Sequence, residues 1–461
     1  MNRAVEPAPG VIGNRPLRAG GAVPFRVAWL LARPRSAGRS AALLPVAAFA
    51  VVTTLLLTVL AGALTFLTWT TELAGLYQLL AALALVLLLV PLLTLGASAA
   101  RLSARRRDAN LSTLRLLGAT SGTVALVSIL ESAALALAGS LAGLGGYLLL
   151  GPLVQLIPFD GAPLGSAYWL NPLVAAAVPA AVVLLAAASA AAGLRRVVLT
   201  PLGVRMRTQP QKAHWLRGLT GLLVIGTVFI LIQTPFADAA AATVVILGGF
   251  AAGLAVLNLA GPWVIAVAAR RRLRRAESPA QLLTARTILD APKAAWRQVS
   301  GVAMVSFVAV FGGTGVALAD GAGGAGPEDF LLQDIRTGIL ITVITGFLMV
   351  ACSAAINSAA GILDRADLYV SLDRMGMPSQ VIDQARTQAV MGPLLTVSLL
   401  SSASAAVLVF PLAGLALVLA PLSVAVIAAC LAVGVLLVRG GLRATRPVLD
   451  GVLAGPAGAG R

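Results

Sequence analysis

Long apolar runs alternate with short polar segments along almost the whole chain. Each run reaches the roughly 20 residues that a helix needs to cross a bilayer. Some runs contain Pro or Gly, such as Pro91 and Pro262, which membrane helices tolerate when neighbouring helices satisfy the freed backbone groups. The pattern predicts an all-α polytopic membrane protein with about ten transmembrane helices. The predicted spans are residues 42–66, 73–99, 123–151, 172–193, 218–235, 241–268, 298–319, 336–360, 387–411 and 415–438.

The polar segment between the second and third spans carries a helical periodicity of its own. Leu111, Leu114 and Leu117 recur at helical spacing, and Arg107 stands near the start of the pattern. Gly118 follows as a helix stop. The segment therefore predicts a short amphipathic helix between two spans. Such a helix either transmits force from a soluble partner or only closes the loop at the membrane surface, and the pattern alone leaves both roles open.

The segment between the eighth and ninth spans has the same plan. Leu368, Leu372 and Met375 form its apolar stripe, and Gly376 is the stop. At one constant offset, Pro34 also matches Pro292, and the two glycine stops match each other. An even number of spans separates the copies, so we expect two parallel four-span repeats joined by a two-span hairpin. The expected divisions are a tail at 1–41, repeats at 42–197 and 298–438, a connector at 198–297 and a tail at 439–461.

Composition and charge fix the expected environment and orientation. Of the 461 residues, 59% are apolar and 11% are charged, which is not the composition of an ordinary soluble protein. The net charge is +17, but with the N-terminus inside, every Lys and Arg except Arg336 falls on the cytoplasmic side. We therefore expect a multi-pass protein of the bacterial plasma membrane, in contact with membrane lipid and with both termini cytoplasmic. Nucleic acid is not an expected partner, because only His214 and Trp215 interleave the short basic loops.

Several kinds of chemistry are missing from the sequence. The two lysines, Lys212 and Lys293, do not follow a glycine, so a phosphate-binding loop for ATP is absent. Cys352 and Cys430 both lie in predicted spans, and the chain has one histidine, so no metal site is predicted. We expect a non-catalytic membrane subunit that carries no catalytic residue and no cofactor of its own.

Glu131 is the most conspicuous single residue of the spans. It follows Ser121 by ten residues and would lie roughly 15 Å into the membrane at 1.5 Å per residue. A carboxyl group at that depth normally faces the helix bundle or a wet cavity. Two roles are open: a substrate or gating contact, and an interhelical hydrogen bond that holds spans together.

The stretch RRRDANLSTLRLLGATSGTVALVSILESAALALAGSLAGLGG resembles the loop and third helix of FtsX/MacB-type permeases, the type VII ABC transporters. The resemblance is carried by the basic–acidic start, the L-R-x-L-G-A run, and an apolar helix with an early Glu and several small residues. It covers Leu43 to Val197 well and Val299 to Val438 more loosely. The layout is similar to the ten-span branch of bacitracin-resistance (BceB-like) permeases.

The resemblance implies that both short helices dock on ABC-type ATPase subunits, one helix per ATPase copy. ATP and Mg would be bound by those two partner copies and not by this chain. The first implied docking set is Arg107, Leu111, Leu114, Arg115, Leu117 and Gly118. The second set is Arg365, Leu368, Leu372, Arg374, Met375 and Gly376.

The outer loops of this sequence differ from those of the families that it resembles. Bacitracin-type and MacB-type permeases carry a large extracellular domain, whereas the loop at 320–335 is too short to fold independently. We therefore expect substrate handling among the spans, with export or extraction of an amphipathic, lipid-like or antimicrobial compound driven by ATP. The alternative is an FtsX-type signalling permease that moves an outer-surface partner and transports nothing. A secondary transporter would call for more intramembrane ionisable groups than Glu131.

Overall fold

The structure is a computed structural model. It describes residues 39–70, 74–88, 91–92, 95–96, 98–99, 121–198, 223–224, 226–227, 230, 239–321, 330–410, 414–415, 418 and 421–454.

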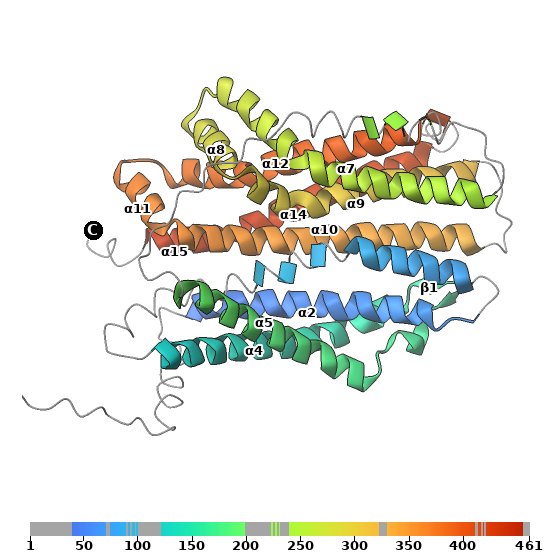
Figure 1. Cartoon of the computed structure of the whole chain (residues 1–461), viewed down its shortest axis with the longest axis horizontal. Coiled ribbons are helices and arrows are strands. Elements are labelled where there is room, and N and C mark those ends of the chain that lie inside the picture. The colour runs from blue at the N-terminus through green and yellow to red at the C-terminus, as the bar shows by residue number, and fades with distance from the viewer. Residues whose placement is uncertain are drawn as a thin grey trace, which may run out of the picture.

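Long helices running nearly side by side make up most of the described chain (Figure 1). Eight of them are long and apolar enough to cross a membrane, among the residues that the structure describes. The prediction of an all-α polytopic membrane protein is therefore confirmed. Predicted span 73–99 is described in part, as the shorter apolar helix Ala74–Leu88, and most of span 218–235 lies outside the described residues. The long helices are α2 (Arg39–Leu67), α4 (Ser121–Gln155), α5 (Pro172–Val198), α7 (Ala239–Arg274), α9 (Pro292–Gly321), α10 (Phe330–Asp364), α12 (Ser379–Leu408) and α14 (Pro421–Arg443).

Short elements connect the long helices at both ends of the bundle. A two-residue antiparallel hairpin between α4 and α5 pairs Pro158 with Pro163 and Phe159 with Ala162. The other short elements are β1 (Pro158–Phe159), β2 (Ala162–Pro163), the 3-10 helix η2 (Gly165–Tyr168), α8 (Pro279–Asp290), α11 (Ala366–Arg374) and α15 (Arg446–Leu453). We call the end with β1 and β2 the hairpin end, and the end with α8, α11 and α15 the basic end. Arg336 is the one basic residue at the hairpin end in the part of the chain that the structure describes.

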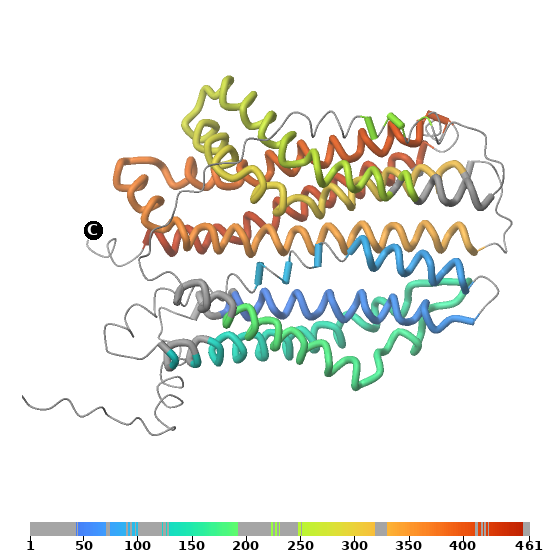
Figure 2. Tube along the Cα trace, viewed as in Figure 1, coloured from blue at the N-terminus to red at the C-terminus, as the bar shows by residue number. Residues whose placement is uncertain are grey.

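Helix α10 lies in the middle of the molecule (Figures 1 and 2). It packs against α9 and α14 on one side and against α2 on the other. The second predicted span also packs on α10, where the hydroxyl oxygens of Ser98 and Ser353 are 3.3 Å apart. Leu95 and Met349 are fully buried in the same core cluster. The group α2, α4 and α5 therefore meets the group α9, α12 and α14 through α10 and the second span.

The two groups pair their helices in equivalent ways. Helix α2 packs closely on α4, and α9 packs closely on α12, so the first and third spans of each predicted repeat are neighbours. Helices α4 and α12 begin at Ser121 and Ser379, which match at the offset of the predicted repeats. These pairings support the predicted duplication, whose domain boundaries stay a prediction.

Small residues let α2 and α4 approach each other closely. A Cβ atom added at Gly143 would lie 2.6 Å from the carbonyl oxygen of Ala50 and 2.7 Å from the Cβ of Thr53. The hydroxyl of Thr54 donates to the carbonyl oxygen of Gly143 at 2.9 Å, so a hydrogen bond also joins the two helices. Close approach at small residues is expected for membrane helices, whose association lacks a hydrophobic driving force.

One helix is longer than the apolar pattern predicts, and two further helices form outside the predicted spans. Helix α10 begins at Phe330, so Asp334 lies within a helix and not in the outer loop at 320–335. Helix α15 forms within the segment predicted as a C-terminal tail. Helix α8 forms in a basic loop, where the Ser278 hydroxyl caps it by accepting from the Gln281 N–H. The Ser-Pro start of α8 is a helix-initiation signal that does not depend on apolar runs.

Candidate functional site

We call the two short helices that carry the implied docking sets the predicted coupling helices. The residues of the first one, Arg107, Leu111, Leu114, Arg115, Leu117 and Gly118, all lie outside the described residues.

The second predicted coupling helix is α11, and it ends where the sequence predicts. Gly376 follows it in the left-handed region, with a φ of 87°. The Met377 N–H donates to the Leu372 carbonyl at 3.1 Å, and the Gly376 N–H donates to the Asp373 carbonyl at 2.9 Å. These two bonds make a Schellman motif, which satisfies the last carbonyls of the helix. Leu372 and Met377 both pack against one core cluster, as the hydrophobic contact of that motif requires.

Gly376→Ala should loosen α11 without unfolding the protein. A Cβ in the left-handed region costs roughly 1 kcal/mol or slightly more. We expect a small fall in the unfolding midpoint and faster hydrogen exchange confined to α11. Gly361→Ala is the control, because Gly361 lies in α10 near the same end, and an added Cβ there meets nothing within 4 Å. Equal exchange rates for the two variants would contradict the role of the Schellman motif.

The two faces of α11 have different environments. Tyr369 is buried against Ile362, Ile382 and Leu449, which come from α10, α12 and α15. Leu372 packs on the same cluster, so it belongs in part to the internal contact with α15 rather than to a free surface. The other predicted docking residues of this set are on the surface: Leu368 is 47% exposed and Met375 is 74% exposed. Arg365 and Arg374 are also exposed beside them.

A buried arginine network lies beneath α11 and α15. One terminal nitrogen of Arg386, in α12, donates to the hydroxyl of Ser358 at 2.7 Å and to that of Thr445 at 2.5 Å. The other donates to the Asp383 carboxylate at 2.6 Å, and the Arg386 side chain is 7% exposed. Because Ser358 lies in α10 and Thr445 is the N-cap residue of α15, the network joins α12 to α10 and to the start of α15.

Glu131 lies in α4 and is partly buried, next to the fully buried Ser132. Among the described residues, the structure gives its carboxylate no hydrogen bond or ion pair. It also does not line the apolar cavity described next. Both of its expected roles, a gating or substrate contact and an interhelical hydrogen bond, stay predictions.

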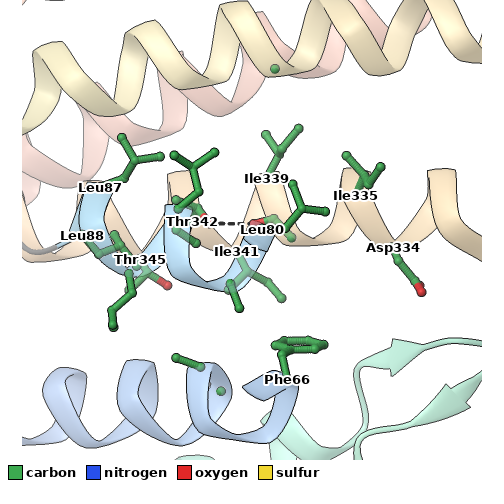
Figure 3. Close-up of a pocket in the computed structure, with 18 of the residues that line it drawn as sticks. Phe66, Leu80, Leu87, Leu88, Asp334, Ile335, Ile339, Ile341, Thr342 and Thr345 are labelled. Carbon is green, nitrogen blue, oxygen red and sulfur yellow. Dashed lines mark hydrogen bonds between the residues drawn. The ribbon is translucent and has the colours of Figure 1, made fainter. Parts of the chain in front are cut away.

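An apolar cavity of about 740 Å³ lies between the two helix groups, toward the hairpin end. Its walls come from α2, helix Ala74–Leu88, α9 and α10, and the loop after α4 closes one end. Figure 3 shows helix Ala74–Leu88 in front of α10, with Asp334 at the end of the row nearest the strands. The polar side chains that line the cavity are Thr58, Tyr77, Asp334, Thr342 and Thr345.

Among the described residues, Asp334 is the one charged side chain that lines this cavity, and it is 4% exposed. Its carboxylate accepts from the Tyr77 hydroxyl at 2.5 Å and from the Asp160 N–H at 2.7 Å. Asp160 occupies the hairpin turn with a φ of 54°, a conformation that Asp tolerates better than most residues. The carboxylate therefore joins α10 to the second predicted span and to the hairpin that follows α4.

Aromatic rings surround the same end of the cavity. The ring of Phe66 stacks on that of Tyr77, with centroids 6.2 Å apart, and meets that of Phe159 edge-on at 4.9 Å. All three rings line the cavity. This group was not predicted from the sequence, because Asp334 falls in the expected outer loop at 320–335 and nothing in the sequence pairs it with Tyr77. The available signal was a lone carboxylate at the start of a strongly apolar run.

Within the described residues, no group of three or more His, Cys, Asp or Glu side chains could hold a metal ion. The helices and the apolar cavity define the class as a polytopic helical membrane protein. Residues 80–201, about a quarter of the chain, match the family described as FtsX-like permease C-terminal. The match supports the FtsX/MacB permease family and a permease-type membrane subunit, as the resemblance implied. It covers part of the first predicted repeat and does not extend to the second. No curated protein and no solved structure matches the chain.

Proposed function

We propose that this chain is the membrane-spanning subunit of a type VII ABC transporter and works with two separate ATPase copies. ATP and Mg bind to those partners, and this chain carries no catalytic residue. The observation that carries the proposal is the match of residues 80–201 to the FtsX-like permease family. Its cargo is an amphipathic or lipid-like compound, which includes antimicrobial compounds. The chain lies in the bacterial plasma membrane, with the basic end and both termini in the cytoplasm.

The surface of α11 supports a docking role at that end. Leu368 and Met375 are large apolar side chains left exposed on a helix that projects from the bundle, with Arg374 between them. The opposite face of α11 is held by packing on α15, and the Arg386 network joins α15 to α10 and α12. Packed side chains transmit displacement because protein interiors have low compressibility. A push on α11 would therefore move the second helix group as a unit.

The apolar cavity favours transport over signalling. A signalling permease needs an outer surface that engages a partner, and the hairpin at that end consists of two strands of two residues each. A cavity of about 740 Å³ is within the range of small-molecule sites and lies between the two groups that would move.

The test is co-purification of the full chain with the ATPase encoded beside it. We expect two ATPase copies per wild-type chain. Leu368→Glu with Met375→Glu should leave one copy, because charge replaces apolar contact on one of two coupling helices. Adding Leu114→Glu should remove the second copy. Loss of a buried apolar anchor costs about 2 kcal/mol or more at an interface, which is at least about thirtyfold in affinity.

Leu282→Glu is the matched control. Leu282 is 51% exposed on α8 at the same end, so it reports the effect of a surface carboxylate away from α11. This variant should keep both ATPase copies. Failure of the wild-type chain to retain any ATPase, or full retention by the triple variant, would refute the proposal.

A further inference from the structure

We propose that the cavity at the hairpin end binds a lipophilic monocation. The cationic group would lie between Asp334 and the rings of Phe66, Tyr77 and Phe159, and the apolar body would extend along helix Ala74–Leu88. This deepens the proposed function by naming a class of cargo, and it rests on that function only in treating the bound molecule as cargo.

The first argument is the charge of the site. Asp334 lies about 6 Å beyond the start of α10 at 1.5 Å per residue and is 4% exposed. A buried carboxylate is costly unless it is paired with a cation or well hydrogen-bonded. Both partners that the structure gives it, the Tyr77 hydroxyl and the Asp160 N–H, are neutral donors. Among the described residues no cation pairs with Asp334, and a cationic group bound in the cavity would complement its carboxylate.

The second argument is the aromatic surround. The face of an aromatic ring attracts cations, and the attraction grows when the cation leaves water. Phe66, Tyr77 and Phe159 line the cavity at the end where Asp334 lies, and the ring of Phe66 contacts those of the other two. A carboxylate within a group of rings recognises bulky cations that keep little water. It would suit a small, strongly hydrated ion poorly.

The third argument is the rest of the lining, which suits an apolar body. Beyond Tyr77 and Asp334, the polar side chains of the wall are three threonines. Thr342 already donates to the Gly338 carbonyl at 2.8 Å, within its own helix. Figure 3 shows leucine and isoleucine side chains extending into the space between Asp334 and Thr345. The cavity thus offers one polar end and one long apolar wall, which is the shape of an amphiphile.

The experiment measures binding of tetraphenylphosphonium to the purified full chain in nanodiscs, without ATPase. Tetraphenylborate is the matched probe, since it has the same shape and the opposite charge. We expect saturable binding of the cation and no saturable binding of the anion. Asp334→Asn should weaken cation binding at least about tenfold, because it removes the charge while its amide oxygen still accepts from Tyr77 and Asp160.

Two further variants distinguish the effect of the Asp334 charge on cation binding from an effect on the structure around it. Asp160→Asn makes the same charge change at an exposed side chain beside the site, and Asn tolerates the left-handed turn, so cation affinity should be unchanged. Tyr77→Phe keeps the ring and removes one of the two donors to the Asp334 carboxylate, whose charge is unchanged, so the cation should still bind. If Asp334 acted only by joining the helices through these hydrogen bonds, Asp334→Asn, which keeps both bonds, would retain cation binding, and Tyr77→Phe, which removes one of them, would lose it.

Equal binding of both probes, or wild-type affinity in Asp334→Asn, would overturn the proposal. Because the measurement involves no ATPase, cation binding combined with failed ATPase co-purification would refute the transporter assignment and leave this site standing. Retained ATPase with no cation binding would refute this cation site and leave the transporter assignment standing.

Discussion

Gly143→Leu should destabilise the protein more than any other single substitution considered for the helix contacts. A Cβ at Gly143 would lie 2.6 Å from a backbone carbonyl oxygen of α2, and backbone cannot rotate away as a side chain can. Helices α2 and α4 would have to separate, and the bond from Thr54 to the Gly143 carbonyl would lengthen. Overpacking of this kind costs about 3 kcal/mol or more. The measurement is the midpoint of thermal unfolding in detergent, which should fall sharply.

Gly145→Leu is the control for Gly143→Leu. Gly145 lies two residues further along α4, is exposed, and an added Cβ there meets nothing within 4 Å. The same leucine at that position should leave the unfolding midpoint close to wild type. If both variants fell equally, the loss would come from the added bulk in the helix, and the contact between α2 and α4 would not be the cause.

Arg386→Met should cause the second large loss of stability. The substitution keeps the side chain long and apolar but leaves Asp383 partly buried, at 22% exposure, without its cation. Breaking a buried ion pair by removing one partner costs about 3 kcal/mol. The hydroxyls of Ser358 and Thr445 lose their donor as well, so α15 should loosen from α10 and α12. We expect a lower unfolding midpoint together with faster hydrogen exchange in α15 and α11.

Arg439→Met makes the same change at an exposed arginine of α14 and should have little effect. Arg386→Met combined with Asp383→Leu should recover part of the lost stability, because the second change removes the uncompensated charge. A double variant as unstable as the sum of the two single ones would show that the ion pair is not what holds this region.

Membrane spans were predictable because the bilayer imposes one length and one composition on every spanning helix. The same rule misses helices that stay outside the apolar region. Helix α15, for example, lies beyond the last predicted span, and its Leu449 packs in the same buried cluster as Tyr369 of α11. Helix α10 starts before its apolar run because Asp334 finds two hydrogen-bond donors there. Contacts with distant parts of the chain decide both cases.

Some features of the candidate site could likewise be predicted from the sequence, and others could not. A glycine stop at Gly376 follows from local backbone geometry, and local sequence predicts it. Which side chains of α11 are free does not follow from spacing, since Leu368 and Leu372 share the predicted stripe but only Leu372 packs on α15. The carboxylate that lines the cavity was missed because its partners, Tyr77 and Asp160, are 257 and 174 residues away in sequence.

The bond between Asp160 and Asp334 has a consequence for biogenesis. The ribosome releases the β1–β2 turn long before it releases α10, so the early half of the chain enters the membrane with that N–H still lacking its acceptor. Contacts between residues so far apart form late, because a long loop must close first. The early helices would thus lack this hydrogen bond until α10 has been synthesised and inserted. A chain truncated before Phe330 should be cleared by membrane quality-control proteases faster than the full-length product.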